Sequence, residues 1–347
     1  MARDKENRST INSGTEKDRV RMVEENEYST DEGEFEVSKR PVKMELQDDV
    51  YHIHEQIELE WPSQTVCISN KESNTIYIGS FPSSESKERG EILKLSVDLD
   101  EKTQKTTKTR TAKVSCPINR IRNTNNNVCS ISDQTLSLFI PSSLKKIDEL
   151  SIGGGYALST WNDVIFYGNG GEVVKRDSST KTASFSLSSP EVFSLAALSE
   201  TVAVAATQTL TLTDFRANES RELFVSTCDI NAVAYNGEHL LVCGDDVGLL
   251  TLVDLRGGGA LEQITFHESP VSNAGFATRD IFATSSDCEV VIWDTTFTDE
   301  WEHHKYLSFV HQGQAFYKDF QFVHENTLIT TSSDGLCVFS PKTELEE

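Results

Sequence analysis

Two groups of residues in this sequence, a set of histidines and two glycine triplets, have types that could do chemistry. His303, His304 and His311 lie close together along the chain, but no cysteine or carboxylate stands at a metal-ligand spacing from them. Glycine triplets at 153–155 and 257–259 do not belong to a GxxxxGKS/T loop and precede no predicted helix, so they are interpreted as loop glycines. The chain also contains no GxSxG or HExxH motif. The sequence therefore predicts no metal, no cofactor and no catalytic residue, which favours a binding protein over an enzyme.

The segment TFTDEWEHHKY (296–306) has a composition suited to binding. Trp301 is flanked by the carboxylates of Asp299, Glu300 and Glu302. An aromatic ring among carboxylates can bind a segment that is both apolar and basic, through burial of the apolar side chains and pairing of the charges. The alternative interpretation is an ordinary acidic surface loop.

The net charge of the chain is −23, from 32 Lys and Arg against 55 Asp and Glu. This balance argues against direct binding to nucleic acid, which requires a basic surface to neutralise phosphates. It favours a basic partner, because an acidic surface attracts and steers cations. The alternative is that the charge serves solubility alone.

Residues 1–42 are predicted to form a disordered acidic arm. Within them, MVEENEYSTDEGEFEVS (22–38) contains acids and no base. The arm is either a solvated tail or a segment that captures a basic partner. The N-terminus lacks the apolar region of a secretory signal, and the chain has no run of about 18 apolar residues, so we expect no membrane span.

Residues 43–60 are predicted to form an amphipathic helix. Four apolar residues recur there at i, i+4, i+7 and i+11, namely Leu46, Val50, Ile53 and Ile57. Trp61-Pro62 would end the helix, because the residue before a proline avoids the α region. We expect this stripe of four apolar side chains to pack against the side of the fold that the rest of the chain forms. The strand-like TVCIS (65–69) that follows would then complete the last repeat of the fold.

Seven cysteines are scattered along the chain without a CxxC pair. Several lie within apolar runs, so they are interpreted as reduced, buried thiols of an intracellular protein.

The stretch SSDCEVVIWD (285–294) is one copy of a repeat. A polar turn, an apolar strand and often an aspartate recur along the chain, and the copies align at seven positions: Leu95, Phe139, Arg176, Thr213, Val253, Trp293 and Phe339. A spacing near 40 residues with β patterning is typical of a propeller with one blade per repeat. Closure into a ring leaves no long sheet edge. The sequence therefore predicts an all-β, seven-bladed propeller over residues 61–343.

The Trp-Asp ending and the period resemble those of WD40-repeat proteins. In that family a hydrogen-bonded set of Asp, His, Ser or Thr, and Trp holds each blade together. The resemblance implies this structural role for His267, Ser285 or Ser286, Asp287 and Trp293 in the sixth repeat. Arg176, Thr213 and Val253 replace the tryptophan in other repeats.

Three further motifs narrow the resemblance: LEWPSQTV (59–66), CPINRIR (116–122) and YLSFVHQG (306–313). Together they resemble the glutamate-rich WD-repeat family of ribosome-assembly factors, whose relatives are the retinoblastoma-associated histone-binding WD proteins. In those relatives the N-terminal helix and the loop before the last blade form a groove for a partner. The resemblance therefore implies a binding site made of Leu46, Val50, Ile53 and Ile57 with Asp299, Glu300, Trp301 and Glu302.

Four charged residues have two interpretations each. Arg120 and Arg122 are expected to brace a strand and to pair with acids of a neighbouring blade, and the alternative is a contact with phosphate. Asp245 and Asp246 are expected to serve a blade turn, and the alternative is ligand binding.

The resemblance implies a nuclear, and more narrowly nucleolar, factor in the assembly of the large ribosomal subunit. Its client would be one basic large-subunit ribosomal protein, shielded until it meets RNA. The alternative is a histone-binding subunit of a chromatin-modifying or chromatin-assembly complex. We expect a monomer that makes no direct contact with nucleic acid or membrane.

Overall fold

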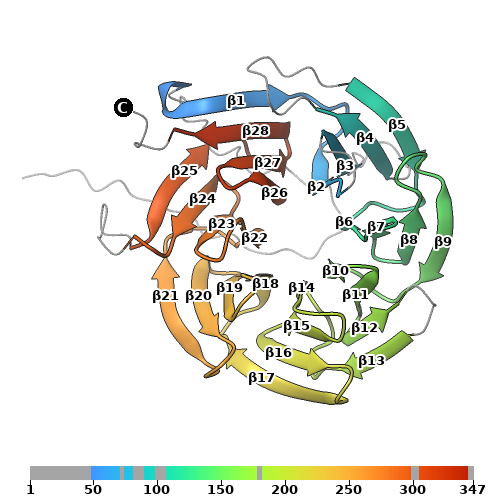
Figure 1. The fold of residues 1–347 in the computed structure, drawn as a ribbon, viewed down its shortest axis with the longest axis vertical. Helices are drawn as coiled ribbons and strands as arrows, with labels where there is room; N and C mark the ends of the chain where they lie inside the picture. The colour runs from blue at the N-terminus through green and yellow to red at the C-terminus, as the bar shows by residue number, and fades with distance from the viewer. Residues whose placement is uncertain are drawn as a thin grey trace, which may run out of the picture. The chain divides into compact units, whose positions relative to one another are not determined.

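Seven four-stranded antiparallel sheets form the folded part of the chain (Figure 1). The computed structural model describes residues 48–70, 74–80, 90–97, 107–177, 182–297 and 305–342. In six of the sheets the strands are neighbours in the order of the chain, so each sheet is one blade built from successive hairpins. Such hairpins need tight turns, which explains the Asp, Gly, Ser and Asn residues between the apolar strands.

The strands run from the inside of each blade to its outer edge. Blades one to three contain β2 (Ser63–Ile68), β3 (Thr75–Ser80), β4 (Glu91–Ser96) and β5 (Thr107–Lys113); β6 (Arg120–Asn123), β7 (Val128–Ile131), β8 (Thr135–Phe139) and β9 (Lys146–Ser151); and β10 (Leu158–Trp161), β11 (Val164–Asn169), β12 (Glu172–Arg176) and β13 (Thr182–Ser186). Blades four to six contain β14 (Ser194–Ala197), β15 (Val202–Ala206), β16 (Thr209–Asp214) and β17 (Glu219–Val225); β18 (Ile230–Tyr235), β19 (Leu240–Asp245), β20 (Leu249–Asp254) and β21 (Ala260–Thr265); and β22 (Asn273–Phe276), β23 (Ile281–Ser285), β24 (Glu289–Asp294) and β25 (Leu307–Gln312). Blade seven contains β26 (Asp319–His324), β27 (Thr327–Ser332), β28 (Gly335–Pro341) and, on its outer edge, β1 (Tyr51–Ile57).

The inner strands close the ring. Each inner strand contacts the inner strand of the next blade, and β26 of blade seven contacts β2 of blade one. Figure 1 shows these strands nearest the centre of the ring, with the outer strands on the perimeter. The predicted seven-bladed propeller is therefore confirmed.

The seven aligned positions of the repeat are structurally equivalent. All of them lie in the third strand of a blade, where they pair with the second strand: Trp293 with Phe282 and Phe339 with Leu328, for example. The equivalence holds for Arg176 and Thr213 as well, although neither is a tryptophan. The strand pattern thus identifies a blade even where the tryptophan is replaced.

The predicted amphipathic helix over 43–60 is wrong within the described residues. Asp48–Val50 form one short 3-10 turn, and Tyr51–Ile57 form strand β1. β1 pairs antiparallel with β28, from Ile57 opposite Leu336 to Tyr51 opposite Pro341. The N-terminal strand, and not TVCIS, therefore completes the last blade, while TVCIS belongs to β2 of blade one.

Two physical facts explain this difference. A spacing of four residues is even, so Ile53 and Ile57 lie on one face of a strand as they would on one face of a helix. In addition, β28 would expose an unpaired edge without β1, and backbone pairing along that edge outweighs the local preference of the segment.

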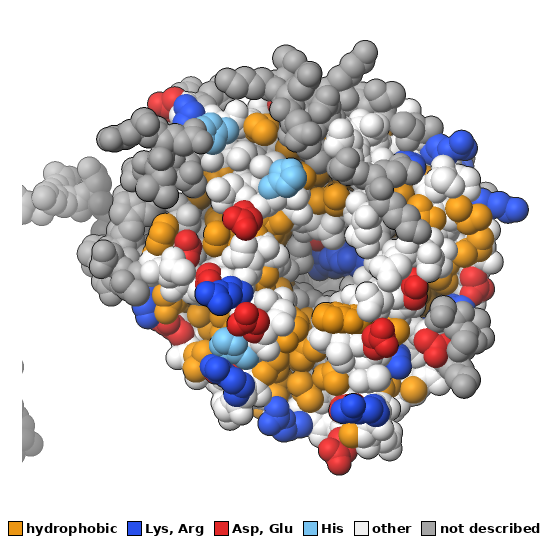
Figure 2. All heavy atoms as spheres, in the orientation of Figure 1, with side chains coloured by type: hydrophobic (Ala, Val, Ile, Leu, Met, Phe, Trp, Pro, Cys, Tyr) orange, Lys and Arg blue, Asp and Glu red, His pale blue; other side chains and the backbone are white. Residues whose placement is uncertain are grey.

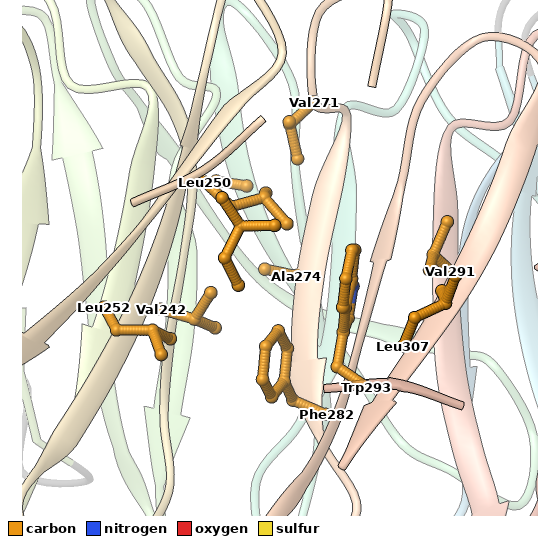
Figure 3. Packing of buried hydrophobic residues seen from close by; sticks show 11 residues of the cluster. Val242, Leu250, Leu252, Val271, Ala274, Phe282, Val291, Trp293 and Leu307 are labelled. Atoms are coloured by element: carbon orange, nitrogen blue, oxygen red, sulfur yellow. The ribbon is translucent and has the colours of Figure 1, made fainter. Parts of the chain in front are cut away.

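The core lies between the blades. The cluster between blades five and six is shown in Figure 3, where Trp293 stands beside Phe282 with ring centroids 6.1 Å apart. Val242 and Leu252 of blade five complete the contact, and all of these side chains are buried. Because each blade buries one face against the next, blades stabilise one another and no blade has a complete core of its own.

Residues 1–42, predicted as a disordered arm, lie outside the described residues, and so does the end of the chain from residue 343.

Four of the cysteines are buried, namely Cys67, Cys129, Cys243 and Cys337, whereas Cys288 is exposed. Burial raises the pKa of the Cys67 and Cys243 thiols to about 12, so both remain protonated at neutral pH. No helix in the described part of the chain is long and apolar enough to span a membrane.

Candidate functional site

One face of the ring is acidic. In every blade, the turn from the second to the third strand and the loop from the fourth strand to the next blade lie at the same end of the strands. The acidic side chains in the described parts of these turns and loops are Glu58, Glu60, Asp133, Glu191, Asp229, Asp246, Glu268, Asp287 and Asp334. Lys318 is the one lysine or arginine in the same segments. We call this surface the acidic face.

Hydrogen bonds join neighbouring segments of the acidic face. The Asn119 side chain donates to Asp133 at 2.6 Å and to the Gly155 carbonyl at 2.8 Å. The exposed apolar side chains of Tyr156 and Val247 stand among these loops. The acidic face therefore combines negative charge with a few exposed apolar side chains, and hydrogen bonds hold its loops together.

The opposite face has mixed charge. Its described turns and loops carry both acids (Asp48, Asp49, Asp163, Asp177, Glu200, Glu238, Asp280 and Glu325) and bases (Lys145, Arg216, Arg256, Arg279, Lys305 and Lys342). Several of these form local pairs, as Arg279 does with Asp280 at 2.9 Å. The excess negative charge of the described loops is thus concentrated at one end of the ring.

Asp299, Glu300, Trp301 and Glu302, predicted as a partner-binding loop, lie outside the described residues. The strands that the loop joins place its two ends on the mixed face, since β24 ends at Asp294 and β25 begins at Leu307. Lys305 and Tyr306 both bond to Glu262 of β21, at 3.2 and 2.7 Å. A groove of about 350 Å³ lies beside Tyr306 and Glu262 and is lined by residues of blades five and six.

The predicted apolar stripe does not stand free to form a groove wall. Leu46 lies outside the described residues, and Val50 is 37% exposed. Ile53 and Ile57 pack against the buried cluster between blades seven and one. Of the three described members of the stripe, Ile53 and Ile57 therefore contribute to the core, and Val50 is exposed.

The sixth blade contains a hydrogen-bonded chain that includes three of the predicted structural residues, namely His267, Ser286 and Trp293. Trp293 Nε1 donates to Thr284 Oγ1 at 2.9 Å, and His267 Nε2 lies 2.8 Å from the same hydroxyl. His267 Nδ1 lies 2.8 Å from Glu289, which also accepts from Ser286. Thr284 and Glu289 thus occupy the positions expected of Ser285 and Asp287.

Ser285 and Asp287 have other contacts. The Ser285 hydroxyl lies 2.8 Å from the hydroxyl of Ser272, the residue that precedes β22. The Asp287 amide donates a hydrogen bond to Ser269 Oγ, and the Asp287 carbonyl accepts one from the Phe316 amide, so Asp287 holds neighbouring loops of the acidic face. Asp245 is a turn residue, whose carboxylate accepts from the Val247 and Leu249 amides.

The largest group of buried charges lies at the central channel. Asp319, at the start of β26, is fully buried and meets two arginines of β6. Arg122 Nη1 lies 3.0 Å from its Oδ2, and Arg120 Nη1 lies 3.3 Å from its Oδ1. Thr65 Oγ1 donates to Oδ2 at 2.6 Å, and Asn273 Nδ2 donates to Oδ1 at 2.8 Å. The two carboxylate oxygens therefore bind residues from blades one, two and six.

Charge explains the ionisation of this group. Burial alone would raise the pKa of Asp319, but Arg122, Arg120 and the hydrogen bonds from Arg122 and Thr65 outweigh it and hold that pKa below its ordinary value. Burial also lowers the pKa of Arg120, whereas for Arg122 the charge of Asp319 outweighs burial and raises the pKa. The charge of Asp319 thus outweighs the effect of burial on the pKa of Arg122 but not on the pKa of Arg120.

The sequence predicts that Arg120 and Arg122 form ion pairs, but it places their acidic partner on the wrong blade. Their acid comes from blade seven, with blade one between, and not from an adjacent blade. Asp319 was not identified, and neither were Thr65 and Asn273. A lone aspartate at the start of an inner strand, in YKDFQF, was the signal that could have indicated it.

His311 lies in an apolar stack. It is fully buried, its ring stacks on Phe339 at 3.8 Å, and its Nδ1 lies 2.9 Å from the Tyr51 hydroxyl. One potential ligand atom each of His54, His311 and Cys337 lies within 4.8 Å of the others. His303 and His304 lie outside the described residues.

Comparison with known proteins identifies the fold. No protein-family model matches the chain, and no curated protein matches it either. The solved structure of U3-55K is similar with a TM-score of 0.68 and 13% identity, covering 81% of this chain and 96% of that one. The crystal structure of RRP9 WD40 repeats is similar with a TM-score of 0.68 and 13% identity, covering 82% and 96%. The chain therefore has the fold of a WD40-type propeller, and at this identity the likeness extends to the fold alone.

Proposed function

We propose that this chain is a non-enzymatic binding protein that holds a basic segment of another protein on its acidic face. The observation that carries the proposal is the one-sided charge of the loops: the described turns and loops of the acidic face hold nine acids and one lysine, Lys318. An acidic surface of this kind accelerates encounter with a cationic segment and excludes nucleic acid. The exposed Tyr156 and Val247 offer apolar contacts within it.

The client that we propose is a basic large-subunit ribosomal protein, and the compartment is the nucleus, including the nucleolus. The motifs at 59–66, 116–122 and 306–313 support this choice through their resemblance to ribosome-assembly factors. Covering cationic surface until the client joins RNA is a task that a net charge of −23 suits. Histones share the required charge and are the alternative client.

The experiment is a pull-down from cell extract with the full chain as bait, washed over a series of salt concentrations. We expect one ribosomal protein, without the rest of its subunit, to be retained at low salt and lost as salt rises. Core histones in its place would assign the protein to chromatin. Retention that does not respond to salt, or no retained basic protein, would contradict the proposal.

Charge-reversal variants locate the surface. Glu60→Lys with Glu268→Lys changes two exposed acids of the acidic face, and Glu200→Lys with Glu325→Lys is the matched control on the mixed face. We expect the first pair to weaken binding about tenfold or more at low salt and the second pair to change it little.

A third variant reverses Asp299, Glu300 and Glu302 together. The sequence predicts that these residues also contact the partner. Loss of binding in this variant alone would place the client on the loop at 296–306 and would contradict the acidic face as the main site.

A further inference from the structure

The inner strands of the ring carry more positive than negative charge. All seven are described, and their residues ionised at neutral pH are Arg120 and Arg122 of β6 and Asp319 of β26. Two guanidinium groups thus face one carboxylate, in a chain whose overall charge is −23. A cation withdrawn from water without a full counter-charge is costly, so the surplus favours an anion.

A cavity is present where this surplus lies. Its volume is about 210 Å³, and it extends from Arg120 and Arg122 along the inner strands of blades three to six. The side chains of the two arginines are 15% and 20% exposed, while that of Asp319 is fully buried. Figure 2 shows a Lys or Arg side chain within the central opening of the ring. A molecule entering the channel therefore meets the arginines and not the carboxylate.

Two serines that line the same cavity have hydroxyl groups that can donate a hydrogen bond to a ligand. Ser159 Oγ accepts from the Ala197 amide at 3.0 Å, and Ser194 Oγ accepts from the Val233 amide at 3.3 Å. Thr65 has the equivalent bond, accepting from Ile121, and uses its hydroxyl hydrogen to bind Asp319. The hydroxyl hydrogens of Ser159 and Ser194 have no acceptor among the described residues. Both hydroxyls can therefore donate to an acceptor that enters from the channel.

We propose that the central channel binds a phosphate-type oxyanion, held by the Arg120 and Arg122 guanidinium groups and the Ser159 and Ser194 hydroxyls. Arginine is the side chain best suited to a tetrahedral oxyanion, because its planar fork of donors binds two oxygens at once. Water occupies about 30 Å³ per molecule in the liquid, so the cavity admits one phosphate group with several waters. This site is separate from the acidic face and does not depend on the proposed function.

Thermal unfolding of the full chain tests the proposal. Phosphate is titrated in a zwitterionic buffer, with sodium chloride adjusted to constant ionic strength. We expect Tm to rise saturably, by about 2–4 °C at ten times Kd. Acetate is expected to give a smaller rise. An equal rise with acetate would overturn the phosphate-type assignment, and no rise with phosphate would overturn the site.

Arg120→Met removes the surplus charge and leaves Arg122 paired with Asp319. We expect it to lose the phosphate-dependent rise, whereas Arg216→Met, at a residue whose side chain is 81% exposed, keeps it. The same rise in Arg120→Met and in the wild-type chain would overturn the assignment. Glycerol 2-phosphate distinguishes two sources of the ligand: a rise equal to that of inorganic phosphate indicates a phosphate group on a larger molecule, and a lost rise indicates free phosphate.

A second measurement needs no variant. The ³¹P resonance of phosphate is expected to broaden in the presence of the wild-type chain and to sharpen when sulfate displaces it. A line width that the protein does not change would overturn the proposal, even if Arg120→Met fails to fold.

Discussion

Arg122 and Asp319 form an ion pair across blade one, although 197 residues separate them in the chain. Their closest atoms, Nη1 and Oδ2, lie 3.0 Å apart, and β2 contacts both of the strands that carry them. The pair therefore joins blade two to blade seven at the point where the ring closes. It can form only after the whole propeller is assembled, which makes it a probe of ring closure.

Replacing Asp319 with asparagine should destabilise the fold strongly. The substitution would leave Arg120 and Arg122 buried beside each other without a counter-charge, at a cost of about 3–5 kcal/mol in the free energy of unfolding. Urea unfolding in phosphate-free buffer measures this change. Asp280→Asn, which removes the acid of a surface ion pair with Arg279, is the control and should cost less than about 1 kcal/mol. A loss as small as that of the control would mean that Asp319 does not hold the ring closed.

The hydrogen-bonded chain in blade six should depend on Thr284 rather than on Ser285. Thr284→Val keeps the shape of the side chain but leaves the buried Trp293 N–H without its acceptor, which costs about 1–3 kcal/mol. Ser285→Ala removes a single hydroxyl contact with Ser272 and should cost less. Unfolding curves of the two variants decide between them, and the reverse order would show that Ser285 supports the tryptophan.

Stability should fall in acid through His311. Burial first, and the nearby His54 second, lower the pKa of His311 to about 3 in the folded chain. A histidine in the unfolded chain titrates near its ordinary value of 6.5, so below that pH the unfolded state takes up a proton that the folded state refuses. The free energy of unfolding contributed by this group should therefore decrease by about 1.4 kcal/mol per pH unit as pH falls from 6.5 towards 3, and be fully present above 6.5.

The variant His311→Phe isolates this effect. It should flatten the pH dependence in that window, whereas replacement of the exposed His324 by glutamine should leave the slope unchanged. Urea unfolding at several pH values compares the slopes. A steep slope that persists in His311→Phe would assign the acid sensitivity to other groups.

The N-terminal strand should be essential, and the residues before it dispensable for folding. Deletion of residues 1–47 leaves β1 and should give a folded propeller with a cooperative thermal transition. Deletion of residues 1–57 removes β1, exposes the edge of β28 and takes away the Tyr51 ring that packs against Phe309 and His311. We expect this second chain to aggregate or to lose its cooperative transition, as seen by light scattering and circular dichroism. A soluble, cooperatively unfolding product would show that blade seven is stable with three strands.

The sequence was sufficient for the features that depend on local patterning. The spacing near 40 residues and the alternation of turn and apolar strand placed Leu95, Trp293 and Phe339 at equivalent positions, and the structure agrees. Side chains face inward or outward with a fixed period in a strand, so this information is contained within each repeat. The replacement of tryptophan by Arg176 or Val253 did not obscure it.

Tertiary structure decided the features that depend on distant partners. Residues 51–57 form a strand because β28, about 280 residues later, supplies its hydrogen bonds. Thr284 and Glu289, rather than their neighbours in sequence, meet His267, which lies in the loop that joins blade five to blade six. Arg120, Arg122 and Asp319 come together only because the ring closes. Local periodicity fixes which way a side chain points, but contacts between blades fix what it meets, and no single repeat contains that information.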